Sequence, residues 1–213
     1  MKKNGTYFAT IINQQQYKPS VWDPYLYRDI HGGKSLSQFV TVQRAGKKAQ
    51  KQYHMPFRPI EYRDILGGEC LSFALELGPP AHSQYVVEEN ILLFGTMRAY
   101  LGNIIITPFA EWINTTAPLY FAIKSEFFVV YPFDELPYFW LVYLRSKKFT
   151  ELLPVGSGGT RPRLTIDAFE QTPVDVPDLQ TRRMIHEKIK ELACIEWRTR
   201  IAVVETVRSF LEE

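Results

Sequence analysis

The segment from Asp178 to the last residue is predicted to form one uninterrupted helix, and it constrains the fold more than any other part of the chain. No Gly or Pro interrupts it, so it could run about 50 Å at a rise of about 1.5 Å per residue. Pro177 precedes Asp178, whose carboxylate can accept hydrogen bonds from the free amides of the first turn. One long helix cannot bury its apolar face alone. It must fold back on the preceding domain or pair with another chain.

Two adjacent apolar stripes follow the helical period in this segment. The first consists of Ile185, Ile189, Leu192, Ile195, Val203, Val207 and Phe210, and the second of Ala193, Trp197, Ile201, Val204 and Leu211. Such a wide face needs contact on more than one side. We predict an antiparallel, coiled-coil-like dimer through residues 185–211. Its predicted interface residues are Ile185, Ile189, Leu192, Ile195, Trp197, Ile201, Val204, Val207 and Leu211.

The preceding residues, 1–177, are predicted to form a mixed α+β domain with a buried β-sheet, and residues 178–213 a separate helical segment. Short β-branched or aromatic runs bounded by Gly or Pro indicate strands, several of them apolar on both faces. These runs are 91–94, 103–107, 119–123 and 127–131. Helical patterns follow at 137–153 and 165–171, before an extended piece at 172–177.

Composition sets limits on the class of protein. The chain has 213 residues, 46% of them hydrophobic and 14% aromatic, which is enough for a core in one domain plus an appendage. A net charge of +2 is too small to indicate a nucleic-acid partner by itself.

Neither a signal peptide nor a run of about eighteen apolar residues is found, so we expect a cytoplasmic protein without membrane spans. The Cys and His residues lack metal-site spacing, so no metal or cofactor is expected; they are Cys70, Cys194, His31, His54, His82 and His186.

The stretch Gln43–Arg63 is the best local signal for nucleic-acid binding. It is basic, and its cations could neutralise phosphates; the alternative is a solvated loop. Three further arginines lie beside glycine turns, where they could contact DNA or simply form salt bridges. The candidate DNA-binding residues are Arg44, Lys47, Lys48, Lys51, Arg58, Arg98, Arg161 and Arg163.

Motifs for catalysis are weak, so no catalytic residue is predicted. Asp23-Pro24-Tyr25 is similar to part of the motif with which DNA amino-methyltransferases grip their target, but a turn explains it better. No glutamate has a lysine two residues later, as a restriction-type nuclease strand usually requires for magnesium chemistry. Gly156–Gly159 is a glycine-rich loop without the lysine of a phosphate-binding loop.

Four segments, taken in order, resemble the target-recognition half of a type I restriction–modification specificity subunit. Residues 89–103 resemble the strand and turn element of that family, with Ala99 where the family has proline. Residues 138–149 resemble its helix, 156–164 its glycine-rich loop, and 174–185 the start of its spacer helix. The likeness covers residues 86–200.

The resemblance implies a DNA-reading protein without catalysis of its own. Family subunits carry two recognition domains and two long helices, whereas this chain is expected to have one of each. It therefore resembles a half-subunit that homodimerises through its helix, reads a bipartite site on double-stranded DNA and recruits methyltransferase and restriction subunits. Two alternatives stay open: a stand-alone methyltransferase or nuclease, and an interaction module that does not bind DNA.

Overall fold

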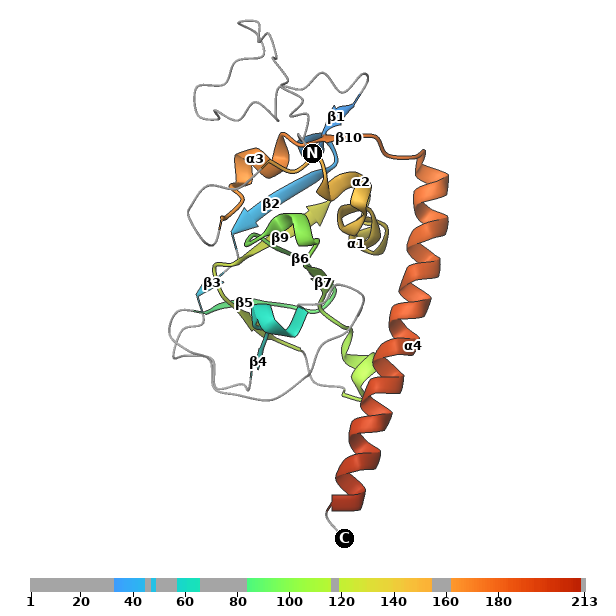
Figure 1. Ribbon diagram of the computed structural model, residues 1–213. Helices are drawn as coiled ribbons and strands as arrows, with labels where there is room; N and C mark the ends of the chain where they lie inside the picture. The colour runs from blue at the N-terminus through green and yellow to red at the C-terminus, as the bar shows by residue number, and fades with distance from the viewer. Residues whose placement is uncertain are drawn as a thin grey trace, which may run out of the picture.

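The computed structural model describes residues 33–44, 47–48, 57–65, 84–115, 119–154 and 162–211. Within them, a four-stranded antiparallel sheet forms the centre of the domain, with the strand order β2-β9-β6-β7 (Figure 1). The inner strands pair in register, so that Leu93 lies opposite Val129 on one side and Ile105 on the other. The strands of this sheet are β2 (Val40–Arg44), β6 (Leu92–Gly95), β7 (Ile104–Ile106) and β9 (Phe127–Pro132).

The side chains of β6 and β7 are buried throughout. A strand with no solvent-facing side needs apolar residues at every position, which is what Leu92–Phe94 and Ile104–Ile106 supply. The strand predictions at 91–94, 103–107 and 127–131 are confirmed.

A second sheet has the order β3-β5-β8-β4, with β4 running parallel to β8 and the other pairs antiparallel. The predicted strand at 119–123 is confirmed as β8. A separate two-stranded pair joins β1 to β10, so the first described residues lie against the segment that leads into the last helix. The strands are β1 (Lys34–Ser35), β3 (Lys47–Lys48), β4 (Arg58–Pro59), β5 (Tyr85–Val87), β8 (Phe121–Ile123) and β10 (Pro173–Val174).

Helices pack on the central sheet. The helix α1 lies between the sheet and the terminal helix (Figure 1), and α3 packs on β2. Aromatic rings fill the space beneath α2 and α3, where the Phe169 ring lies 4.5 Å from that of Phe94 and 5.9 Å from that of Phe149. The helices are α1 (Pro137–Arg145), α2 (Lys147–Thr150) and α3 (Ile166–Glu170), with 3₁₀ turns η2 (Leu36–Gln38), η3 (Tyr62–Ile65), η4 (Ala99–Leu101) and η5 (Ala110–Ile113).

The helix predicted at 137–153 is divided in two at Ser146. This residue has an extended backbone (φ −63°, ψ 147°), and its hydroxyl accepts a hydrogen bond from the Phe149 amide at 3.3 Å. A serine that caps a new helix in this way competes with continuation of the old one. Thr165 caps α3 in the same manner, at 3.2 Å from the Ala168 amide, and the prediction of a short helix at 165–171 is confirmed.

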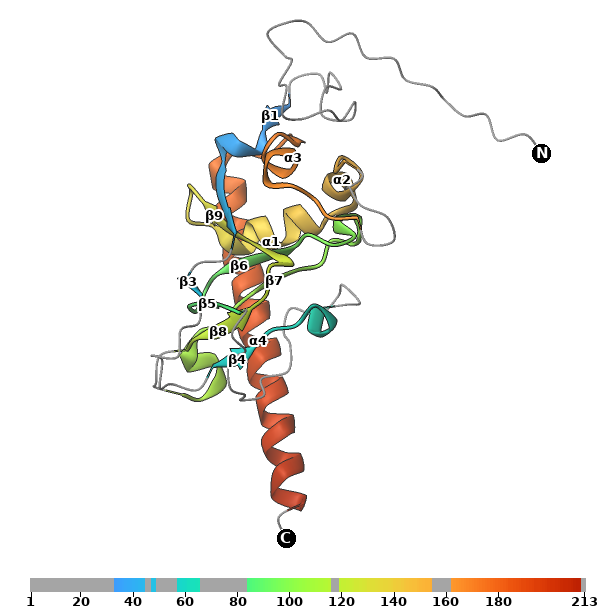
Figure 2. The ribbon, with the colours of Figure 1, turned by 90° about the vertical axis from the view of Figure 1, so that its left-hand side faces the viewer.

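The terminal helix α4 (Leu179–Leu211) runs along one side of the domain, and its C-terminal part projects beyond it (Figures 1 and 2). The predicted cap is confirmed, because the Asp178 carboxylate accepts from the Thr181 amide at 3.0 Å. The helix packs on α1 and η5. Of the two ways to bury its apolar face, the helix therefore uses the domain of its own chain for the first part of its length. The division of the chain at residue 177 remains a prediction.

Candidate nucleic-acid interface

The predicted cations of the 43–63 stretch lie on edge strands. Arg44 ends β2, an edge of the central sheet, and is exposed. Lys47 and Lys48 form β3, an edge of the second sheet. Edge strands leave one side free for another molecule. Lys51 and Arg161 lie outside the described residues, so their positions stay predictions.

Arg58 is separated from this group. It lies on β4, the edge of the second sheet opposite to β3. Its Nε atom is buried with no hydrogen-bond partner in the described part of the chain, and burial lowers the pKa of its guanidinium. The structure thus does not bring Arg58 together with Lys47 and Lys48.

Arg98 and Arg163, by contrast, are brought side by side from distant parts of the sequence. Met97 and Arg163 form an isolated β-bridge. The Arg98 amide donates to the Pro162 carbonyl at 3.2 Å, and the Leu164 amide to the Thr96 carbonyl at 3.0 Å. Both arginines are exposed, and Nη2 of Arg163 lies 3.6 Å from a carboxylate oxygen of Glu126. Two guanidinium groups therefore lie at the same end of the central sheet.

The turn that carries Arg98 has an unusual backbone. Arg98 has φ 48° and ψ 48°, in the left-handed region, and Gly102 has φ 63°. For a residue other than glycine this conformation costs about 1–2 kcal/mol. It is maintained by hydrogen bonds within the turn, from the Leu101 amide to the Arg98 carbonyl and from the Gly102 amide to the Ala99 carbonyl.

Tyr62 supports the turn from beneath. Its hydroxyl donates to the Met97 carbonyl and accepts from the Asn103 amide nitrogen at 3.2 Å. Burial raises the pKa of the phenol, so it keeps its proton for this hydrogen bond. Gly95 leaves room for the ring, because a Cβ there would lie 2.7 Å from the Tyr62 Cε2 atom.

A hollow of about 160 Å³ lies beside the base of this turn. Its acids are paired with cations, since Glu61 lies 3.0 Å from Lys124 and Glu126 faces Arg163. In the described ranges, no group of three or more His, Cys, Asp or Glu side chains is placed to hold a metal ion. The hollow is lined by Ile60, Glu61, Tyr62, Met97, Lys124, Glu126 and Phe127.

The residues predicted for the dimer interface fall into two sets on α4. Ile185, Ile189, Trp197 and Ile201 pack on the core of their own domain, and Trp197 is only 1% exposed. The other set faces solvent, with Ile195 55% exposed. Its members are Leu192, Ile195, Val204 and Val207, and Val203 and Phe210 are exposed as well. The side chain of Leu211 is not among those described.

Polar contacts fix the start of α4 to the domain. Arg182 forms an ion pair with Asp134, both largely buried, and its guanidinium lies 5.9 Å from the centre of the Phe39 ring. Nδ1 of buried His186 accepts from the Tyr138 amide at 3.3 Å, which requires a neutral ring. Burial lowers the pKa of His186 and so favours that neutral form.

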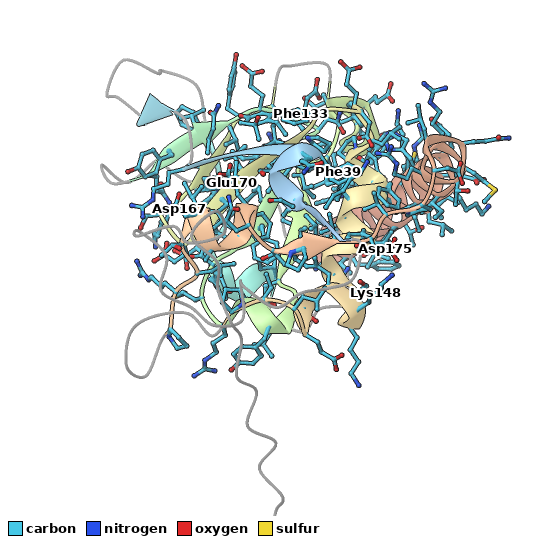
Figure 3. The ribbon with its side chains drawn as sticks, turned by 90° about the horizontal axis from the view of Figure 1, so that it is seen from above. Phe39, Phe133, Lys148, Asp167, Glu170 and Asp175 are labelled. Carbon is cyan, nitrogen blue, oxygen red and sulfur yellow. The ribbon has the colours of Figure 1, made fainter. Side chains whose placement is uncertain are left out.

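The segment that leads into α4 is also fixed. Figure 3 shows Lys148 and Asp175 side by side, and their charged groups lie 3.0 Å apart. The hydroxyl of Tyr143 accepts from the Asp175 amide at 3.0 Å. These contacts, together with the Arg182 ion pair, connect the start of α4 and the segment before it to the domain.

Tyr100 and Leu101 are exposed beside Arg98, and neither is among the residues predicted from the sequence to contact DNA. Their position between two wholly apolar strands, just before Gly102, is the signal that could have placed them at a hairpin tip. No helix in the described part of the chain is long and apolar enough to cross a membrane.

No protein-family model and no curated protein matches this sequence. Solved structures with a similar arrangement exist. One, from work on complex assembly and conformational transition of the type I R-M system, is 18% identical with a TM-score of 0.48 and covers 87% of this chain and 45% of that chain. Another, the HsdS subunit from Thermoanaerobacter tengcongensis, is 15% identical with a TM-score of 0.46 and covers 84% of this chain and 41% of that chain. This chain thus spans less than half the length of either solved chain.

Proposed function

We propose that this chain is a sequence-specific DNA-binding specificity subunit of a type I restriction–modification system. It acts as a half-subunit: two copies pair through α4, and each places one recognition domain on double-stranded DNA. Methyltransferase and restriction subunits, recruited to the bound site, supply the chemistry. The subunit itself contributes no catalytic group and no cofactor. It acts in the cytoplasm, because its partner is DNA.

One observation carries the proposal: the four segments that resemble this family are neighbours in the fold. The 89–103 segment forms β6, η4 and β7, and its turn is bridged to Arg163 at the end of the third segment. A Cβ at Gly102 would lie 3.2 Å from the Arg145 carbonyl and 3.4 Å from the Thr150 side chain, so the turn rests on the end of the second segment. The fourth segment begins α4, which packs on α1.

The exposed cations support a DNA partner. Arg44 is exposed at the end of β2, and Arg98 and Arg163 are exposed at the turn after β6 and the bridge beside it. The edge strand β3 adds two lysines. A duplex presents phosphates along its whole length, so cations at several edges of one domain can each neutralise one. Phosphate contacts of this kind set the register of a protein on DNA.

The exposed apolar residues of α4 support the homodimer. We call them the outward stripe, and they are Leu192, Ile195, Val203, Val207 and Phe210. Leu192, Val203 and Phe210 are exposed on one side of the helix, at successive separations of about three and about two turns. They lie away from the stripe that includes Trp197, which the domain of the same chain already covers. A second copy, related by a twofold axis, would cover the exposed stripe with the same stripe of its own. In an antiparallel pair the helix length would set the distance between the two half-sites.

The lysines at 47, 48 and 51 provide a test. Replacing all three with alanine (Lys47→Ala, Lys48→Ala and Lys51→Ala) should weaken binding to any duplex and lower the slope of log K against log salt by about 3, since each phosphate contact contributes about 0.9. Fluorescence anisotropy over a range of salt concentrations measures both the affinity and its salt slope. The control replaces three exposed cations of α4, as Arg183→Ala, Lys188→Ala and Arg198→Ala. Equal slopes for the test variant and the unaltered chain would show that the 43–63 stretch does not contact phosphates.

A further inference from the structure

The tip of the turn between β6 and β7 exposes two large side chains. Tyr100 is 60% exposed and Leu101 47% exposed, whereas their neighbour Ala99 is buried. The strands on both sides are buried. The chain therefore comes to the surface here only to reverse direction, and it presents an aromatic and an aliphatic side chain to solvent at that point. The turn is the green helical segment beside α2 in Figure 1.

The turn is held in one shape before any partner arrives. Its backbone is fixed by the hydrogen bond from Arg98 to the Pro162 carbonyl and by the Tyr62 hydroxyl on the Met97 carbonyl. Gly102 packs against the end of α1. A surface that is already ordered loses little conformational entropy when it binds, so Tyr100 and Leu101 are suited to contact a partner directly.

The groups around this tip indicate the chemistry of the partner. Arg98 lies in the same turn, and Arg163, with a side chain 53% exposed, is joined to it by the β-bridge at Met97. Two cations beside an apolar tip match a surface that has anions at its rim and apolar groups within. A DNA groove has this pattern, with phosphates along its edges and stacked bases and methyl groups inside.

We propose that the β6–β7 turn enters a groove of the recognised DNA, where Tyr100 and Leu101 contact base pairs and Arg98 and Arg163 contact the flanking phosphates. This rests on the proposed function and names a part of the domain that contacts base pairs. Apolar side chains of this kind contact thymine methyl groups in the major groove or base steps in the minor groove.

The test uses the full chain and a duplex that it enriches from a pool of randomised duplexes, with an unrelated duplex for comparison. The variant Tyr100→Ala/Leu101→Ala should lose about 10- to 100-fold of its preference for the enriched duplex. Its affinity for the unrelated duplex should change less than about twofold, because the phosphate contacts remain. Phe133→Ala removes an aromatic side chain that is also 60% exposed but follows the end of β9 (labelled in Figure 3), and it should leave the preference unchanged.

Arg98→Gly tests the cation separately, because glycine adopts the left-handed backbone without strain. It should weaken binding to both duplexes and lower the salt slope by about 1.

Thermal unfolding midpoints close to that of the unaltered chain would show that each variant is folded. If the chain enriches a duplex and Tyr100→Ala/Leu101→Ala retains its full preference, the assignment of the turn is wrong while the proposed function stands. If the chain enriches no duplex, both fail.

Discussion

Replacing Trp197 with alanine will lower the free energy of unfolding by about 3–5 kcal/mol, as expected when a large buried aromatic side chain is removed from a core. Trp197 is 1% exposed and belongs to the hydrophobic core that the domain shares with α4. Neighbouring contacts also hold the helix there, including Lys190, whose Nζ atom lies 5.2 Å from the centre of the Phe109 ring.

Equilibrium unfolding in urea, followed by circular dichroism, measures this change. Met184→Ala is the matched control, because Met184 lies on the same helix and is 67% exposed; it should change stability by less than about 0.5 kcal/mol. A Trp197→Ala variant as stable as the control would mean that α4 does not pack on its own domain in solution.

Adding charge to the outward stripe of α4 should convert the dimer into monomers. The variant Ile195→Glu/Val203→Glu/Val207→Glu places three carboxylates where we propose that two apolar stripes meet. If burial of each charge costs about 1 kcal/mol or more, the dimer weakens by about 100-fold or more. All three side chains are about half exposed in the single chain, so the domain itself should keep its stability.

Light scattering after size-exclusion chromatography gives the mass in solution for this comparison. The control Arg183→Glu/Arg198→Glu adds acidic side chains to the same helix at exposed positions outside the apolar stripe, and it should remain dimeric. A triple variant with the same mass as the unaltered dimer would show that the outward stripe of α4 is not the interface.

The elements of the fold could largely be predicted from the sequence, because local patterns determine them. The strands β6, β7, β8 and β9 are short apolar runs between breakers, and Asp178 marks the start of α4. The break at Ser146 was missed, since a mid-helix serine can face solvent or cap a new helix, and only packing decides which.

The sequence does not predict which surface each apolar stripe of α4 contacts. Periodicity shows that Trp197 and Ile195 both belong to an apolar face, but it does not distinguish contact within one chain from contact between two. The structure makes that distinction by placing Trp197 in the core and leaving Ile195 exposed. A truncation before α4 would therefore remove part of the core of the domain as well as the proposed interface.

The candidate site was found only in part, for a related reason. Cations such as Arg98 and Arg163 can be picked out by residue type, but their adjacency depends on a β-bridge between distant segments. Tyr100 and Leu101 are exposed in a turn that begins with Arg98 in the left-handed conformation, which is unusual for arginine. Contacts remote in sequence and a strained backbone leave no periodic pattern from which to predict them.

Enrichment of duplexes from a randomised pool by the purified full chain tests the central claim most directly. A dimer of DNA-reading half-subunits should enrich two half-sites arranged as an inverted repeat, separated by a spacer of constant length and free sequence. Recovery of an unenriched pool, at a protein concentration where the chain is folded and dimeric, would contradict sequence-specific DNA recognition by this chain.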